Sequence, residues 1–234
     1  MGLGAALYTS VGHAGASSYI ALMALFSVPA ATMRPTALAL NIVAAMLAVH
    51  RYGRAGLIRW RAVWPFMTGA VPFAFIGGGI QIPGQYYRPL VGAVLILTAV
   101  RLLWIGDIGA KRPASDPPVW GGIAIGAAIG LLAGLTGTGG GIFLSPVIVF
   151  MGWASIRTAS GCAAAFILGN SIAGLLGNVA AIRALPEELP VYVVAVILGA
   201  LVGTTLGTRL PARTIQRVLA VVLLIAGAKL FGVY

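Results

Sequence analysis

The chain has 234 residues, of which 60% are hydrophobic and 8% are charged. A soluble domain, which carries about 25% charged residues, is excluded, and so is a disordered chain. The 15 basic residues outnumber the 4 acidic ones, but they stand between apolar runs rather than in a patch, so no nucleic-acid partner is expected. A single cysteine, Cys162, excludes a disulfide framework and a cysteine-rich metal site. The composition predicts an all-α polytopic membrane protein.

Six apolar stretches are long enough, at about 20 residues, to cross a bilayer as helices. In chain order they are Met33–His50, Val63–Ile82, Pro89–Ile105, Thr158–Ile182, Leu189–Leu210 and Ile215–Tyr234. Two further apolar stretches, Leu3–Val28 and Val119–Trp153, are interrupted by glycine and polar residues. We expect the helix to break within each of these two segments.

The hydrophilic stretch 107–118 contains two acids, two bases and three prolines. We interpret it as a linker between an N-terminal repeat, residues 1–106, and a C-terminal repeat, residues 119–234. Each repeat is expected to hold one broken segment followed by three spans. Such internal repeats are common in transporters.

The order of features supports the repeat. The Gly12–Gly15 motif precedes the Gly137–Gly140 motif by 125 residues, and Gly69 precedes Gly199 by 130. The distribution of basic residues favours an inverted relation between the repeats, because basic loops tend to be cytoplasmic. If each broken segment enters and returns on one side as a re-entrant hairpin, 11 basic residues share one side and 4 the other.

If each broken segment instead spans the membrane once, 9 of the 15 basic residues lie on one side and 6 on the other, which is a weaker bias. The sequence therefore predicts a cell (inner) membrane protein with two inverted repeats and both termini outside the cytoplasm. Ten full spans have the same parity and remain an alternative. The stretch Leu3–Ser10 is too short to cross, at about 1.5 Å per residue, which favours a hairpin in the first repeat.

The two breaks are the candidate substrate site. The run Thr136–Gly141 is expected to leave backbone N–H groups free at the start of the next helix, where the helix dipole also attracts anions. Hairpin tips that enter from opposite faces meet near the midplane, where transporters place substrate. The predicted binding residues are Gly12, His13, Gly15, Ser17 and Ser18 in the first break and Thr136, Gly137, Thr138, Gly139, Gly140 and Gly141 in the second.

Polar residues inside apolar spans complete the predicted binding set: Asn41, Asn170 and Ser171. For these residues an interhelical hydrogen bond and a substrate contact are equally expected. His13 is the sole ionisable side chain in either break and is either a proton relay or a hydrogen-bonded hairpin residue. Arg34 either sets the topology or binds an anion.

Two glycine stripes have a different interpretation. Glycines recur at every fourth residue in both: Gly122, Gly126, Gly130 and Gly134, and then Gly199, Gly203 and Gly207. Small residues at this spacing are typical of closely packed membrane helices. The glycines of the second break do not follow this spacing, which favours a loop or a ligand role for them.

Two runs carry a family resemblance. Gly130–Ile148, GLLAGLTGTGGGIFLSPVI, and Ala163–Gly177, AAAFILGNSIAGLLG, resemble the glycine-rich signature of the sulfite exporter TauE/SafE family. The resemblance extends over both halves. It implies a permease for a small sulfur oxyanion or organosulfonate, of the sulfite, thiosulfate and sulfonate class.

We therefore predict a permease for a small anion, not an enzyme, with lipid as its surroundings and no cofactor or metal. An anion channel or a uniporter for another small anion is the main alternative, because all four acids lie in loops. Two further alternatives are a non-transporting assembly subunit and an intramembrane enzyme. The enzyme would pair Ser17 or Ser18 with His13, but no acid orients the histidine. The oligomeric state stays open, a homo-oligomer included.

Overall fold

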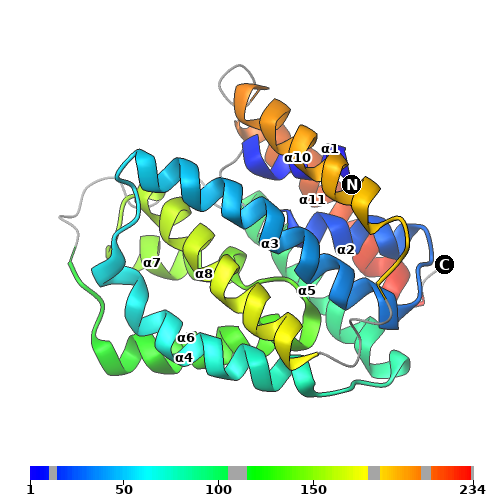
Figure 1. The fold of residues 1–234 in the computed structure, drawn as a ribbon, viewed down its shortest axis with the longest axis horizontal. Helices are drawn as coiled ribbons and strands as arrows, with labels where there is room; N and C mark the ends of the chain where they lie inside the picture. The colour runs from blue at the N-terminus through cyan, green and yellow to red at the C-terminus, as the bar shows by residue number, and fades with distance from the viewer. Residues whose placement is uncertain (11–14, 105–114, 179–184, 207–211, 233–234) are drawn as a thin grey trace.

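The computed structural model describes residues 1–10, 15–104, 115–178, 185–206 and 212–232. This part of the chain contains ten helices joined by turns and irregular connections, and no strand (Figure 1). The helices are α1 (Gly2–Ser10), α2 (Ala16–Leu25), α3 (Ala30–Arg54), α4 (Trp60–Gly79), α5 (Gly84–Trp104), α6 (Val119–Thr136), α7 (Gly141–Phe150), α8 (Ile156–Gly177), α10 (Leu189–Leu206) and α11 (Ala212–Leu230).

Among the described residues, five helices are long and apolar enough to cross a membrane: α3, α4, α5, α6 and α8. Four of them correspond to expected spans, and α6 is the unbroken first part of the second interrupted segment. All four begin a few residues before the expected span, whereas only α3 also ends after it; α4, α5 and α8 end at Gly79, Trp104 and Gly177, before the expected last residues. The last two expected spans correspond to α10 and α11, and both run into residues outside the described part.

The remaining helices are short. With 9 residues in α1 and 10 each in α2 and α7, each is about 15 Å long. A hydrocarbon core of about 30 Å requires twice that length. These three helices flank the two expected breaks, so neither broken segment is a continuous helix.

The first glycine stripe packs against α4. A Cβ atom added to Gly126 would overlap the carbonyl oxygen of Phe66, and one added to Gly130 would overlap that of Ala70. Gly134 meets the carbonyl of Ala74 in the same way. The backbones of α4 and α6 are therefore in direct contact along this stripe, which confirms the packing interpretation.

The second stripe packs against α1. A Cβ atom on Gly199 would overlap the carbonyl oxygen of Gly2, and one on Gly203 would overlap that of Ala6. Gly207, the third member, lies outside the described residues. In both pairs the first helix of one half lies along the penultimate helix of the other, since α6 pairs with α4 and α1 with α10.

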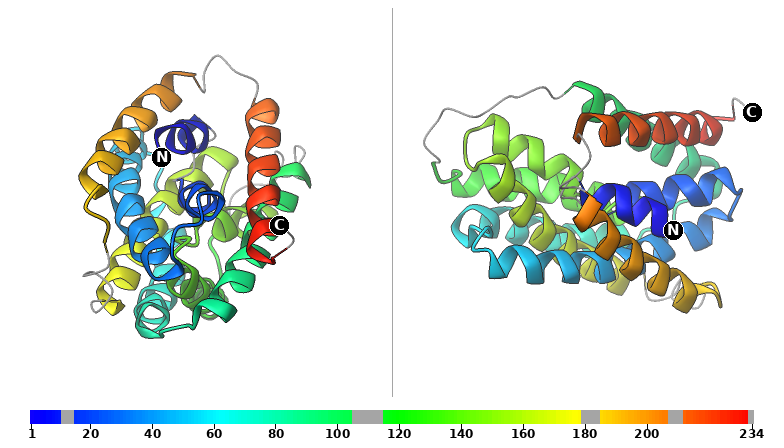
Figure 2. Two further views of the ribbon diagram at one scale, coloured as in Figure 1. Left: turned by 90° about the vertical axis from the view of Figure 1, so that its right-hand side faces the viewer. Right: turned by 90° about the horizontal axis from the view of Figure 1, so that it is seen from above.

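The segment α6–α7 starts and finishes at the same end of the bundle. Arg59, just before α4, donates one hydrogen bond to Asp116 Oδ1 at 2.7 Å and one to the carbonyl oxygen of Trp153 at 2.8 Å. Asp116 precedes α6 and Trp153 follows α7. The chain thus runs inward along α6 and returns along α7 (Figures 1 and 2).

The segment α1–α2 has its ends on the other side. Lys229, in the last turn of α11, donates hydrogen bonds to the carbonyl oxygen of Leu25 at 2.6 Å and to Ser27 Oγ at 3.0 Å. The start of α1 and the end of α11 lie on the side where α2 ends and α3 begins, opposite the start of α6 (Figures 1 and 2). The two broken segments therefore open toward opposite ends of the bundle.

Candidate functional site

The second break is a tight glycine turn between α6 and α7. Helix α6 ends at Thr136, and Gly137 follows in the left-handed region at φ +85°. Gly139 and Gly140 also have positive φ, +72° and +76°. Residues with a Cβ atom rarely adopt this conformation, so the turn requires glycine at these positions. The expected loop is confirmed for 137–140, whereas Gly141 is already the first residue of α7.

The threonines stabilise the turn. The hydroxyl of Thr136 bonds to the carbonyl oxygen of Leu132 at 2.7 Å and lies 2.9 Å from the hydroxyl of Thr138. Both side chains are buried. Their hydroxyl groups are thus engaged with each other and with α6.

Backbone donors are left free at the start of α7. No described residue accepts a hydrogen bond from the N–H groups of Gly139, Gly140, Gly141 and Ile142. The first N–H groups of a helix have no partner within the helix and carry the positive end of its dipole. Buried donors without partners are costly, so this turn is suited to a group that brings acceptor oxygens.

Three of the predicted binding residues converge at Gly139. A methyl group built on Gly139 would lie 2.7 Å from Asn41 Nδ2 and 3.2 Å from Ser171 Oγ. Asn41 comes from α3 and Ser171 from α8, so three separate elements meet here. Neither side chain is exposed, and both of them lack a hydrogen-bond partner among the described residues.

Asn170 is the neighbour of Ser171 on α8 and is 1% exposed, with both amide atoms unpartnered among the described residues. It follows Asn41 by 129 residues, which falls within the 125–130 offset of the repeat. Buried polar side chains normally have a hydrogen-bond partner. Three unpartnered ones on two packed helices therefore mark a polar position inside an apolar bundle.

The first break is described in part. Gly12 and His13 lie outside the described residues. Gly15 precedes α2, and Ser18 Oγ donates a hydrogen bond to its carbonyl oxygen at 2.6 Å. Ser17 and Ser18 are buried at the start of α2. A Cβ atom on Gly4 would lie 2.5 Å from Ser18 Oγ, so this serine faces α1.

Arg34, for which the sequence left two roles open, is buried beside the end of α4. It is 5% exposed and donates hydrogen bonds to the carbonyl oxygens of Ile80, at 2.9 Å, and Gly78, at the C-terminal end of α4. A Cβ atom on Gly137 would lie 3.3 Å from Arg34 Cγ, so the arginine stem borders the glycine turn. Its position inside the expected span Met33–His50 was the available signal.

A cavity of about 850 Å³ reaches Arg34. Its polar lining is Arg34, Gln81, Gln85, Tyr87, Arg88 and Asn178, and no described acidic residue lines it. The hydroxyl of Tyr87 donates to the carbonyl oxygen of Thr136 at 3.0 Å, which joins the cavity wall to the break. Nothing in the sequence pattern indicated this role for Tyr87.

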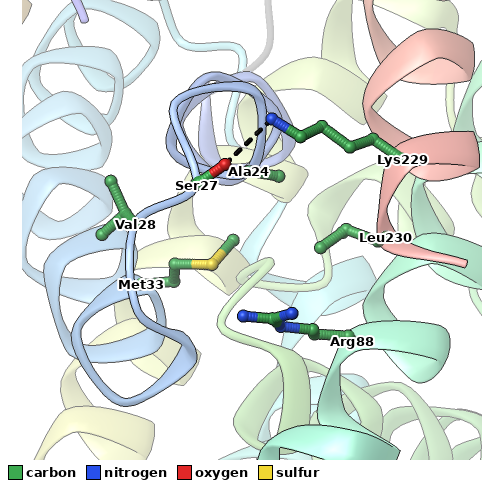
Figure 3. Close-up of a pocket in the computed structure, with 7 residues that line it drawn as sticks. All are labelled: Ala24, Ser27, Val28, Met33, Arg88, Lys229 and Leu230. Atoms are coloured by element: carbon green, nitrogen blue, oxygen red, sulfur yellow. Dashed lines mark hydrogen bonds between the residues drawn. The ribbon is translucent and has the colours of Figure 1, made fainter. Parts of the chain in front are cut away.

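Arg88 also lines a second, smaller cavity of about 90 Å³ together with Ser27 and Lys229. Figure 3 shows Lys229 and Arg88 reaching from α11 and α5 toward the connection between α2 and α3. The amine of Lys229 is already bonded to Ser27 in this view. This end of the bundle thus presents three basic side chains around two adjoining cavities.

No group of three His, Cys, Asp or Glu side chains able to hold a metal ion occurs in the described part of the chain. The polar groups at Gly139 are backbone N–H, carboxamide and hydroxyl groups. The N–H groups lie at the start of a helix, a position where anions bind.

These features define a polytopic helical membrane protein with a polar break inside the bundle. The chain matches the family "Sulfite exporter TauE/SafE" over residues 1–230, and it belongs to this family as a membrane transporter. It is similar to the "Probable membrane transporter protein y4hK" of Sinorhizobium fredii, with 36% identity over 230 residues that cover 95% of this chain and 92% of that protein. No solved structure matches the chain.

Proposed function

We propose that this permease carries a small sulfur oxyanion or organosulfonate and binds it beside Gly139. The observation that carries the proposal is the convergence of free N–H groups with the unpartnered side chains of Asn41 and Ser171. An oxyanion offers several acceptor oxygens at once, which matches several donors around one point. Charge-assisted hydrogen bonds to an anion are about twice as strong as neutral ones.

The remaining predicted residues belong to the same proposal. Gly137, Thr136 and Thr138 shape the turn, Gly140 and Gly141 begin α7, and Asn170 is the counterpart of Asn41 in the second half. From the first break, Gly12, His13, Gly15 and Ser17 supply the facing side of the site, and Ser18 holds the carbonyl group of Gly15 at the start of α2. The inward course of both broken segments supports this arrangement.

Inverted repeats, residues 1–106 and 119–234 about the linker 107–118, are part of the proposal. Two observations support them: the broken segments open to opposite ends, and α6 packs on α4 as α1 packs on α10. Rocking of one half against the other then exposes the site alternately to each side. The protein sits in the cell (inner) membrane with both termini outside the cytoplasm.

A uniporter is the second candidate. The described acidic residues, Asp116, Glu187 and Glu188, all lie outside the helices. A carboxylate within the membrane is the usual group that couples transport to protons or sodium. Since the described helices contain no carboxylate, we propose that the anion gradient itself drives transport. Flux that persists after protonophores and sodium ionophores have collapsed the proton and sodium gradients supports a uniporter.

Thermal unfolding of the purified protein with sulfite, thiosulfate, sulfate and an alkyl sulfonate tests the binding site. A ligand at about 100 times its Kd stabilises the folded form by about 2.7 kcal/mol. The variant Gly139→Ala places a methyl group among the proposed donors and should lose this stabilisation. Gly56→Ala is the matched control, because Gly56 has a similar φ of +66° with nothing within 4 Å of its added Cβ.

Both alanine variants carry the same left-handed backbone cost, about 1–2 kcal/mol. Only Gly139→Ala fills the site, so only this variant should lose the response to the oxyanion. Equal responses of the two variants contradict binding at Gly139. If no sulfur oxyanion or sulfonate stabilises the wild-type protein, the proposed substrate class is wrong.

A further inference from the structure

The larger cavity brings a buried cation close to the glycine turn. Arg34 lines this cavity, and its stem packs against Gly137, two residues before Gly139. Asn41 follows Arg34 by seven residues on α3, which is two helical turns and about 10 Å along the same face. Arg34 and Asn41 therefore flank one side of the break, with Arg34 nearer the cavity.

The guanidinium group has no carboxylate partner among the residues that the structure describes. Its two described hydrogen bonds go to the carbonyl oxygens of Gly78 and Ile80, while its Nε atom has no described acceptor. The single ion pair among the described residues joins Arg59 to Asp116 at the opposite end of α4. Carbonyl oxygens at a helix C-terminus stabilise a cation in part, but a charge buried at 5% exposure favours a counter-ion.

The cavity supplies the route for such a counter-ion. Arg88, on α5, contributes a second positive charge to the same wall. Two neutral polar side chains of the lining are paired, since Gln81 Nε2 donates a hydrogen bond to Asn178 Oδ1 at 3.0 Å. A volume of about 850 Å³ is ample for a hydrated small anion. A concave surface with one sign of charge concentrates ions of the opposite sign.

We propose that this cavity is an outer binding site for the oxyanion, with Arg34 as its counter-charge. The Arg34 guanidinium supplies its charge to the cavity wall while two of its N–H groups hold the end of α4. The anion binds here before it moves past Gly137 to the donors at Gly139. This inference rests on the proposed function and adds a second site on the same path.

The probe is sulfite, or the sulfonate that stabilises the wild-type protein. Two concentrations of this probe are measured: the one that gives half-maximal thermal stabilisation, and the one that gives half-maximal flux into vesicles. Arg34→Gln removes the charge and should raise both concentrations by about tenfold or more. Arg34→Lys keeps the positive charge but lacks the planar set of N–H donors of a guanidinium. This variant should give half-maximal concentrations between those of the wild type and Arg34→Gln. Arg61→Gln is the control, since Arg61 is exposed at the other end of α4 and should not change either concentration.

Arg88→Gln provides an independent variant if Arg34→Gln does not fold. Its side chain is exposed, so folding should be unaffected, while loss of the second cavity charge should raise both concentrations about threefold at low salt. Wild-type values for Arg34→Lys and Arg88→Gln overturn the outer site but leave the proposed function standing. A wild-type protein that neither binds nor carries any sulfur oxyanion overturns both.

Discussion

At the scale of single residues, the site rests on polar side chains that the fold itself leaves unused. Asn41 and Ser171 are fully buried beside Gly139 and have no described hydrogen-bond partner. An unpaired buried amide costs about 1–3 kcal/mol. A group kept at such a cost is better explained by a ligand than by packing.

This explanation leads to a prediction for Asn41→Leu, which replaces the amide with an apolar group of similar volume. The folded protein should be as stable as the wild type or more stable, because the unpaired amide is removed. Stabilisation by the oxyanion should be lost. Melting curves with and without sulfite measure both quantities, and a lower melting temperature of the ligand-free variant would show that Asn41 has a structural role instead.

At the scale of helices, glycine sets how closely α6 approaches α4. The carbonyl oxygens of Phe66, Ala70 and Ala74 occupy the positions where side chains of the stripe would lie. The pair α4–α6 links the two halves of the chain, so this contact also holds the second break in position.

Gly126→Leu should separate α6 from α4. The added side chain would overlap the backbone of Phe66, and overpacking of this kind costs about 1–3 kcal/mol. Gly121→Ala is the control on the same helix, because Gly121 is half-buried and its added Cβ meets only Pro118 Cγ at 3.3 Å. Thermal unfolding in detergent should show a lower midpoint for Gly126→Leu alone; a similar midpoint for the two variants argues against close packing.

The same helices show what the sequence could predict. Spacing of four identified the packing stripes, since it follows from helical geometry alone. Gly137, Gly139 and Gly140 could be distinguished from the stripes because they do not follow the spacing of one glycine in every four residues. The sequence left two roles open for Arg34, because its hydrogen bonds depend on where the end of α4 lies. Tyr87 and the cavity depend in the same way on tertiary contacts between α3, α5 and α8.

At the scale of the whole molecule, the charge distribution and the course of the broken segments agree. Arg51, Arg54, Arg59 and Arg61 gather where α3 ends and α4 begins, the end at which α6–α7 opens. The other end carries Arg34, Arg88 and Lys229 around the two cavities. In the proposed topology, the first end is cytoplasmic and the cavities face outward.

Cysteine labelling tests this orientation. In a Cys162→Ala background the chain has no other cysteine, and Ala31→Cys and Ala55→Cys place single thiols at exposed positions on the two ends of α3. A membrane-impermeant maleimide applied to intact cells should label Ala31→Cys and leave Ala55→Cys unlabelled until the cells are opened. The reverse pattern means that the protein is inserted the other way, with the cavities on the cytoplasmic side.

Flux through the purified protein is the most direct test of the central claim, that a small sulfur oxyanion crosses the membrane through the glycine break. Vesicles containing the wild-type protein and loaded with radiolabelled sulfite or sulfonate should release the label, and an excess of unlabelled oxyanion should compete. Vesicles with folded Gly139→Ala should retain the label, while Gly56→Ala should release it like the wild type. Release of a cation with no flux of any sulfur oxyanion, or undiminished release through Gly139→Ala, would contradict the claim.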